Sequence, residues 1–108
     1  RRKHQRHYTS TILIYKKENT PKVSKTINLS LGGAKVSTPN ELPHHELFDI
    51  TLLLGNKAVQ TVGQVIYSRK EMGNFPAYHS GIKFGDLSIV DGQILDDYFT
   101  SLSAGKTS

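Results

Sequence analysis

Apolar and polar residues alternate along most of the first 84 positions, and a period of two is typical of strands with one buried face. The pattern predicts six strands, over residues 10–17, 22–31, 34–37, 47–54, 58–68 and 78–84. Turn-forming residues separate them at positions 19–21, 32–33, 39–43, 55–56 and 73–74. Six short, closely spaced strands predict an all-β fold, an antiparallel sheet closed into a small six-stranded barrel, with a sandwich as the alternative.

The period changes near the end of the chain. From Ile89 to Leu102 apolar residues recur at helical spacing, while acidic residues take the other side. Ser88 stands where an N-cap belongs, and Asp91 falls in the first turn. These signals predict one C-terminal amphipathic α-helix that packs on the barrel or plugs it, although Gly92 lowers its helix propensity by about 1 kcal/mol.

The composition excludes several classes of protein. The 108 residues contain no cysteine, so disulfides and thiolate metal sites are absent and a reducing, cytoplasmic location is expected.

No apolar run approaches the roughly 20 residues of a membrane span, and no signal-like segment opens the chain, so direct membrane insertion is not expected. The five histidines form no recognisable metal pattern, and no serine lies in a nucleophile elbow. We therefore expect no metal site, no catalytic residues and no enzymatic activity.

The positive charge is concentrated at the N-terminus. Residues 1–7 contain Arg1, Arg2, Lys3 and Arg6 and no acidic residue, whereas residues 8–108 carry ten basic and nine acidic residues. A nearly neutral body argues against a broad nucleic-acid-binding face and favours a local site for a small anion. A solvated basic tail is the alternative. We divide the chain into a flexible basic arm (1–9), a barrel with its helix (10–102) and a disordered tail (103–108).

A second cluster of candidate residues follows the second predicted strand. The alternation places Val23, Ile27, Leu29 and Leu31 on one face of this strand, so the residues expected to point outward are Ser24, Thr26, Asn28 and Ser30. An Asn amide offers a donor and an acceptor to a base edge, and a Ser hydroxyl can donate to phosphate. Gly33 permits a tight turn or the close approach of a ligand. An ordinary strand end remains the alternative for this segment.

The two clusters together resemble the ligand motifs of the PilZ domain family, the bacterial receptors for cyclic di-GMP. The family pattern Arg-x-x-x-Arg is matched by Arg2 and Arg6, and Asp/Asn-x-Ser-x-x-Gly is matched by Asn28, Ser30 and Gly33. Residues 63–67 and 81–84 are similar to two further strands of the family. The resemblance covers residues 1–102.

The resemblance implies a barrel whose N-terminal arm folds over cyclic di-GMP. Arg2 and Arg6 would clamp guanine and phosphate, Asn28 would read a guanine edge, Ser30 would help to hold phosphate, and Arg1 is an additional cation within reach of a phosphate. Arginine forks suit both chemical groups. The implied function is a non-enzymatic second-messenger receptor that changes conformation on binding. It would control an attached domain or a partner protein in processes such as motility, biofilm formation or exopolysaccharide synthesis.

Two other functions remain open. Some barrels of this family serve pilus assembly without binding a nucleotide, so a ligand-independent interaction adaptor is the leading alternative. A small basic barrel could also bind single-stranded nucleic acid, which requires exposed aromatic residues interleaved with basic ones along a groove. The sequence shows no such array, and we expect neither DNA nor RNA as a partner.

Overall fold

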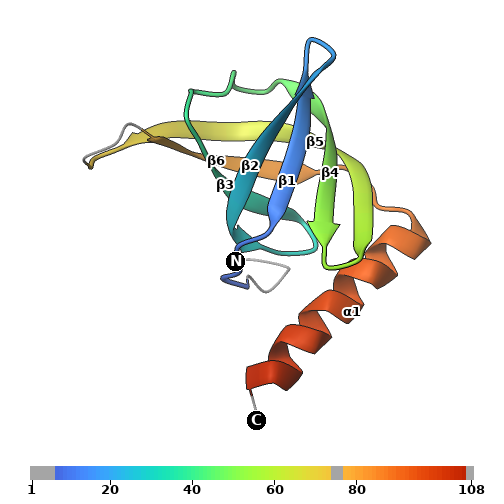
Figure 1. Ribbon diagram of the computed structural model, residues 1–108. Helices are drawn as coiled ribbons and strands as arrows, with labels where there is room; N and C mark the ends of the chain where they lie inside the picture. The colour runs from blue at the N-terminus through green and yellow to red at the C-terminus, as the bar shows by residue number, and fades with distance from the viewer. Residues whose placement is uncertain (1–6, 74–76, 107–108) are drawn as a thin grey trace.

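The computed structural model describes residues 7–73 and 77–106, with the side chains of the helix described as far as Leu102. It contains six strands and one C-terminal helix, as the hydrophobic pattern predicts (Figure 1). The elements are β1 (Ile12–Lys17), β2 (Thr20–Leu29), β3 (Gly33–Thr38), β4 (Leu47–Leu54), β5 (Lys57–Glu71), β6 (Ala77–Phe84) and α1 (Ile89–Lys106).

The strands form a closed barrel in the order β1-β2-β3-β6-β5-β4, and every neighbouring pair is antiparallel. The interior is filled by buried aliphatic side chains from all six strands, with Leu13, Val36, Leu52, Val59 and Val65 fully buried. Closure removes the exposed edges that an open sheet of this size would present. The predicted six-stranded antiparallel barrel is therefore confirmed.

The turn between β1 and β2 differs from the prediction. Glu18 and Asn19 both adopt positive φ, +53° and +65°, which is the geometry of a two-residue hairpin turn. We expected the break at residues 19–21, but Pro21 lies inside β2 opposite Lys16. The prediction was wrong because the proline was taken as a breaker, whereas the tight turn is made by the two residues before Thr20.

The inner and outer faces of β2 also differ from the prediction. Ser24 and Thr26 are buried at 4% and 3% exposure, while Val23 is 65% exposed. The hydroxyl of Ser24 donates to the carbonyl of Leu13, so this polar side chain is satisfied inside the barrel. An irregularity between Thr26 and Asn28 then shifts the register against β3. Alternation alone therefore assigned the first half of this strand to the wrong faces.

Helix α1 begins where the capping signal predicts. The N–H group of Asp91 donates to the Ser88 hydroxyl at 3.0 Å, and Leu95 and Phe99 are buried against the barrel. Ile89 and Val90, assigned to the apolar face, are instead 92% and 68% exposed, since the first turn of the helix lies outside the contact. Among the residues that the structure describes, no helix is long and apolar enough to cross a membrane.

The end of α1 lies beyond its expected position. The helix extends to Lys106 and so includes residues 103–106, which we had assigned to the tail. Each further residue adds one hydrogen bond to a helix already formed.

Candidate ligand-binding site

The turn between β2 and β3 is shaped by Ser30. The N–H group of Ser30 donates to the carbonyl of Gly33 at 2.8 Å, and the N–H group of Gly32 donates to the Ser30 hydroxyl at 3.2 Å. The same hydroxyl lies 3.3 Å from the carbonyl oxygen of Gly33. Half-buried Ser30 therefore stabilises its own turn in the protein without ligand.

Gly33 is required by the neighbouring strand. A Cβ atom at this position would overlap the carbonyl oxygen of Ile82 in β6 and would lie 3.3 Å from the Cα atom of Lys83. Because these are backbone atoms, they cannot move aside as the end of a flexible side chain would. The close approach that this glycine permits is thus between two strands.

Asn28 lies on the outer face of the barrel but is covered. The register pairs it with Lys35, whose neighbours Ala34 and Val36 point into the core. The position of Asn28 on the outer face agrees with the expectation, but this residue is only 5% exposed and so is not open to solvent. The end of β2 is flanked on one side by β3 and on the other by residues 7–11, which leaves no open edge there.

Residues 7–11 hold the end of the arm against β2, the motif strand, which carries Asn28 and leads into Ser30. His7 exchanges two backbone hydrogen bonds with Leu29, at 2.8 and 2.9 Å, and Leu29 is the residue between Asn28 and Ser30. Further along, the hydroxyl of Thr26 donates to the carbonyl of Thr9 at 2.8 Å. Residues 7–9, assigned to the flexible arm, are therefore tied to β2. The other three candidate residues, Arg1, Arg2 and Arg6, lie outside the described residues.

The register also places residues near Asn28 that the sequence analysis did not select. Lys35 pairs with Asn28 on one side and with Gly81 on the other, and Gly81 pairs with Tyr67 in β5. The guanidinium carbon of Arg69 lies 4.9 Å from the centre of the Tyr67 ring. A row of an amide, an ammonium group and an aromatic ring thus crosses four strands.

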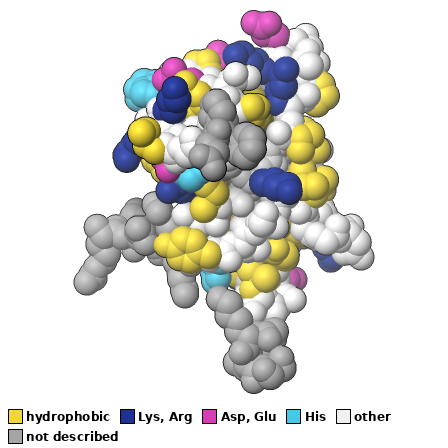
Figure 2. Space-filling view, turned by 60° about the vertical axis from the view of Figure 1, so that its left-hand side comes forward, with side chains coloured by type: hydrophobic (Ala, Val, Ile, Leu, Met, Phe, Trp, Pro, Cys, Tyr) yellow, Lys and Arg dark blue, Asp and Glu magenta, His cyan; other side chains and the backbone are white. Residues whose placement is uncertain are grey.

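The charged side chains of the described residues do not merge into one basic surface on the face shown in Figure 2. Lysine and arginine side chains there are separated by apolar, uncharged and acidic ones. This distribution agrees with the nearly neutral body of the chain and gives no support to a nucleic-acid-binding groove on that face.

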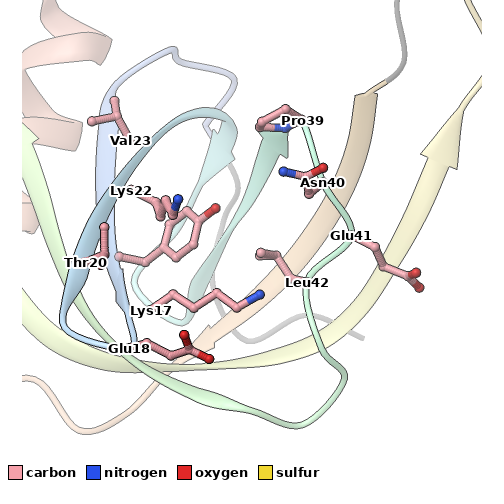
Figure 3. A pocket seen from close by; sticks show the side chains of 10 residues that line it. Lys17, Glu18, Thr20, Lys22, Val23, Pro39, Asn40, Glu41 and Leu42 are labelled. Carbon is pink, nitrogen blue, oxygen red and sulfur yellow. The ribbon is translucent and has the colours of Figure 1, made fainter.

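A separate hollow of about 350 Å³ lies near the start of β2 (Figure 3). The residues that line it include Tyr15, Leu42 and four charged residues, Lys17, Lys22, Glu18 and Glu41. Burial raises the pKa of the Tyr15 hydroxyl. Lys22 and Asn28 are six residues apart on β2, about 20 Å along an extended strand. Two cations balanced by two carboxylates suit a dianion less well than the unopposed charges of the arm.

Comparison with known proteins identifies the fold family. The family model described as "PilZ domain" matches residues 1–101, which include both candidate motifs. The chain belongs to the PilZ domain family. PilZ domains are cyclic di-GMP receptors and are typically non-catalytic. No curated protein matches the sequence significantly.

Solved PilZ structures share the whole architecture at low sequence identity. The inhibitor of motility MotI/DgrA from Bacillus subtilis has a TM-score of 0.85 at 16% identity, over 100% of this chain and 54% of that protein. The PilZ domain of Escherichia coli YcgR with c-di-GMP has a TM-score of 0.78 at 20% identity, over 98% of this chain and 94% of that domain. The K. pneumonia MrkH complex with c-di-GMP has a TM-score of 0.82 at 17% identity, over 100% of this chain and 56% of that protein.

These similarities establish the PilZ fold. The chain spans about half the length of MotI/DgrA and MrkH. Within the described residues, no group of three or more His, Asp or Glu side chains is arranged to hold a metal ion.

Proposed function

We propose that this PilZ domain binds cyclic di-GMP between its N-terminal arm and the end of β2. The observation that carries the proposal is the backbone pair between His7 and Leu29, which joins the arm to the strand between Asn28 and Ser30. Because the pair is antiparallel, the amino-terminal side of His7 faces the side of Leu29 on which Ser30 follows. The proposal therefore brings two motifs, about twenty residues apart in sequence, to one location.

The chemistry of the ligand fits the residue types. Cyclic di-GMP has two phosphates and two guanines, and the guanidinium groups of Arg2 and Arg6 can form paired hydrogen bonds with both kinds of group. Arg1 adds a cation for a phosphate. Asn28 offers a donor and an acceptor to a guanine edge, and Ser30 offers a hydroxyl to a phosphate. Since Asn28 is 5% exposed, binding must replace whatever covers this side chain in the free protein.

The proposed response is a change in the arm. Residues 1–7 carry four positive charges and no acidic residue, and their mutual repulsion falls when a dianion lies among them. Binding would fix the arm against the barrel and present a changed surface to an attached domain or a partner protein. Hydrogen exchange in residues 1–9 should slow when cyclic di-GMP is added. Equal exchange rates with and without the ligand would contradict this response.

Calorimetric titration tests the binding itself. Loss of one bidentate arginine contact should weaken the affinity about 5- to 150-fold, so Arg2→Ala and Arg6→Ala should each show a loss in that range. Arg2→Lys should not restore binding, because an ammonium group cannot form the paired contact. Lys22→Ala is a charge-matched control at the other end of β2. Loss of thermal stability in step with loss of affinity would instead assign these arginines to the fold.

A ligand-independent adaptor is the second candidate, and one observation favours it. Ser30 stabilises a turn and Gly33 allows a close strand contact, so two of the three residues of the second motif are explained without a ligand. The adaptor predicts no heat on titration with cyclic di-GMP and a partner protein that binds equally well with and without it.

A further inference from the structure

The side chain of His7 connects the arm to the helix. Its ring stacks on the ring of Phe99 in α1, with centroids 4.2 Å apart and planes inclined by 12°. Phe99 is 7% exposed and belongs to the hydrophobic core. The backbone of the same histidine is bound to Leu29 by two hydrogen bonds. One residue is thus held by the helix through its ring and by the motif strand through its backbone.

A second contact repeats this connection two residues later. The hydroxyl groups of Thr9 and Tyr98 lie 3.2 Å apart, while the carbonyl of Thr9 accepts a hydrogen bond from Thr26. Two successive helix residues therefore meet alternate residues of the segment 7–11, which runs between β2 and α1. Figure 1 shows the start of the described chain at the end of the barrel that faces the later turns of the helix.

The ring contact has an energetic consequence for the motif strand. The pair between His7 and Leu29 is an isolated bridge, and backbone hydrogen bonds that do not belong to a continuous ladder open easily unless side chains hold them. The stack on a buried phenylalanine supplies that support. A change that weakens the packing of the later turns of α1 therefore also weakens the junction, the two hydrogen bonds between His7 and Leu29.

We propose that His7 is a positioning residue for the nucleotide site: its stack on Phe99 fixes the arm beside Leu29, so that packing of α1 and binding of cyclic di-GMP strengthen each other. This inference rests on the proposed function. By linkage, a ligand that stabilises the junction stabilises the packed helix by the same factor by which the packed helix raises its affinity. The helix thereby becomes the element through which occupancy is sensed.

Affinity measurements test the positioning role. His7→Ala removes the ring and keeps the backbone pair, and should weaken binding of cyclic di-GMP about 2- to 10-fold, the range of one aromatic pair. His7→Phe keeps a flat ring and should bind like the wild type. Phe99→Leu keeps most of the apolar volume without a ring and should lose affinity by a similar factor. Val90→Ala, at a position 68% exposed on the same helix, is the matched control.

The double variant makes the test sharper. If the two rings act as a pair, His7→Ala combined with Phe99→Leu should cost no more affinity than either change alone. Additive losses would contradict the proposal. An equal loss in His7→Phe and His7→Ala would also overturn it, because the imidazole would then be needed for its own polar contact.

Amide exchange in the ligand-free protein gives a readout independent of the nucleotide. The N–H group of Leu29 donates to the carbonyl of His7, so its exchange should be faster in His7→Ala and Phe99→Leu and unchanged in Val90→Ala. Unchanged exchange in all variants would overturn the proposal. A wild-type protein that does not bind cyclic di-GMP would overturn the proposed function and this inference together. A wild type that binds, with unaltered affinity in both ring variants, would overturn the positioning role alone.

Discussion

The ring of Tyr67 occupies the space where a side chain on Gly81 would lie. A Cβ atom built on Gly81 would fall 2.9 Å from both Cδ2 and Cζ of the tyrosine ring. The two residues are partners in the β5–β6 ladder, and the next two strands, β3 and β2, bring Lys35 and then Asn28 into the same row. The glycine therefore allows an aromatic ring to lie close to the sheet beside the candidate site.

The first prediction concerns this pair. Gly81→Ala should displace the Tyr67 ring and destabilise the domain by about 1 to 3 kcal/mol, the usual cost of overpacking. Urea unfolding measures the cost. In a Tyr67→Ala background the same glycine substitution should cost much less, because the overlapping atoms are gone. Equal costs in the two backgrounds would show that the ring is not the obstacle.

Gly33→Ala should be more harmful than Gly81→Ala. Its Cβ atom would overlap the carbonyl oxygen of Ile82, a backbone atom that can move only if β3 and β6 separate. We expect a loss of about 3 kcal/mol in the free energy of unfolding, at the upper end for overpacking. Chemical denaturation without ligand is the measurement. A stable Gly33→Ala protein that fails only to bind cyclic di-GMP would instead assign this glycine to ligand contact.

Gly92 should respond in the opposite direction. It lies inside α1, and a Cβ atom there would meet no atom within 4 Å apart from its chain neighbours and the nearby backbone of its own helix. Gly92→Ala should therefore stabilise the domain by about 0.5 to 1 kcal/mol, since alanine loses less conformational entropy in a helix. Thermal unfolding should show a raised midpoint. A lowered midpoint would mean that the helix packs more tightly at this position than the structure shows.

Burial of Tyr15 predicts an alkaline limit to stability. Its pKa is raised above the ordinary value of 10.0, so the folded state keeps this proton at a pH where the unfolded chain loses it. The contribution of the protonated Tyr15 hydroxyl to the free energy of unfolding is complete below pH 10, and it declines as the pH rises towards the folded-state pKa. The difference in unfolding free energy between wild type and Tyr15→Phe should be constant through neutral pH and shift against the wild type above about pH 10. A constant difference up to pH 11 would contradict this.

The fold could be predicted from the sequence where one local signal acted alone. The limits of β4 at Leu47 and Leu54 follow from a mostly apolar segment that ends at the turn residues Gly55 and Asn56, and the start of α1 follows from Ser88. The inner face of β2 could not be predicted in this way. Ser24 and Thr26 are polar by type, but their hydroxyl groups are satisfied by carbonyls of neighbouring segments, which brings them inside. Only the pairing of strands reveals those partners.

The candidate site was predicted by residue type but not by arrangement. Asn28, Ser30 and Gly33 were selected from their spacing, but spacing does not reveal that Asn28 is covered or that Lys35 lies opposite it. The contact between His7 and Phe99 joins residues 92 positions apart in the chain. Such a contact depends on where the helix crosses the end of the barrel, which no local pattern specifies.

The most direct test of the account is a calorimetric titration of the domain with cyclic di-GMP, run in parallel on wild type, Arg6→Ala and the control Lys22→Ala. We predict saturable binding by the wild type and the control, and a loss of about 5- to 150-fold in Arg6→Ala at unchanged thermal stability. No measurable binding by the wild type, or the same affinity in all three proteins, would contradict a nucleotide site between the arm and β2.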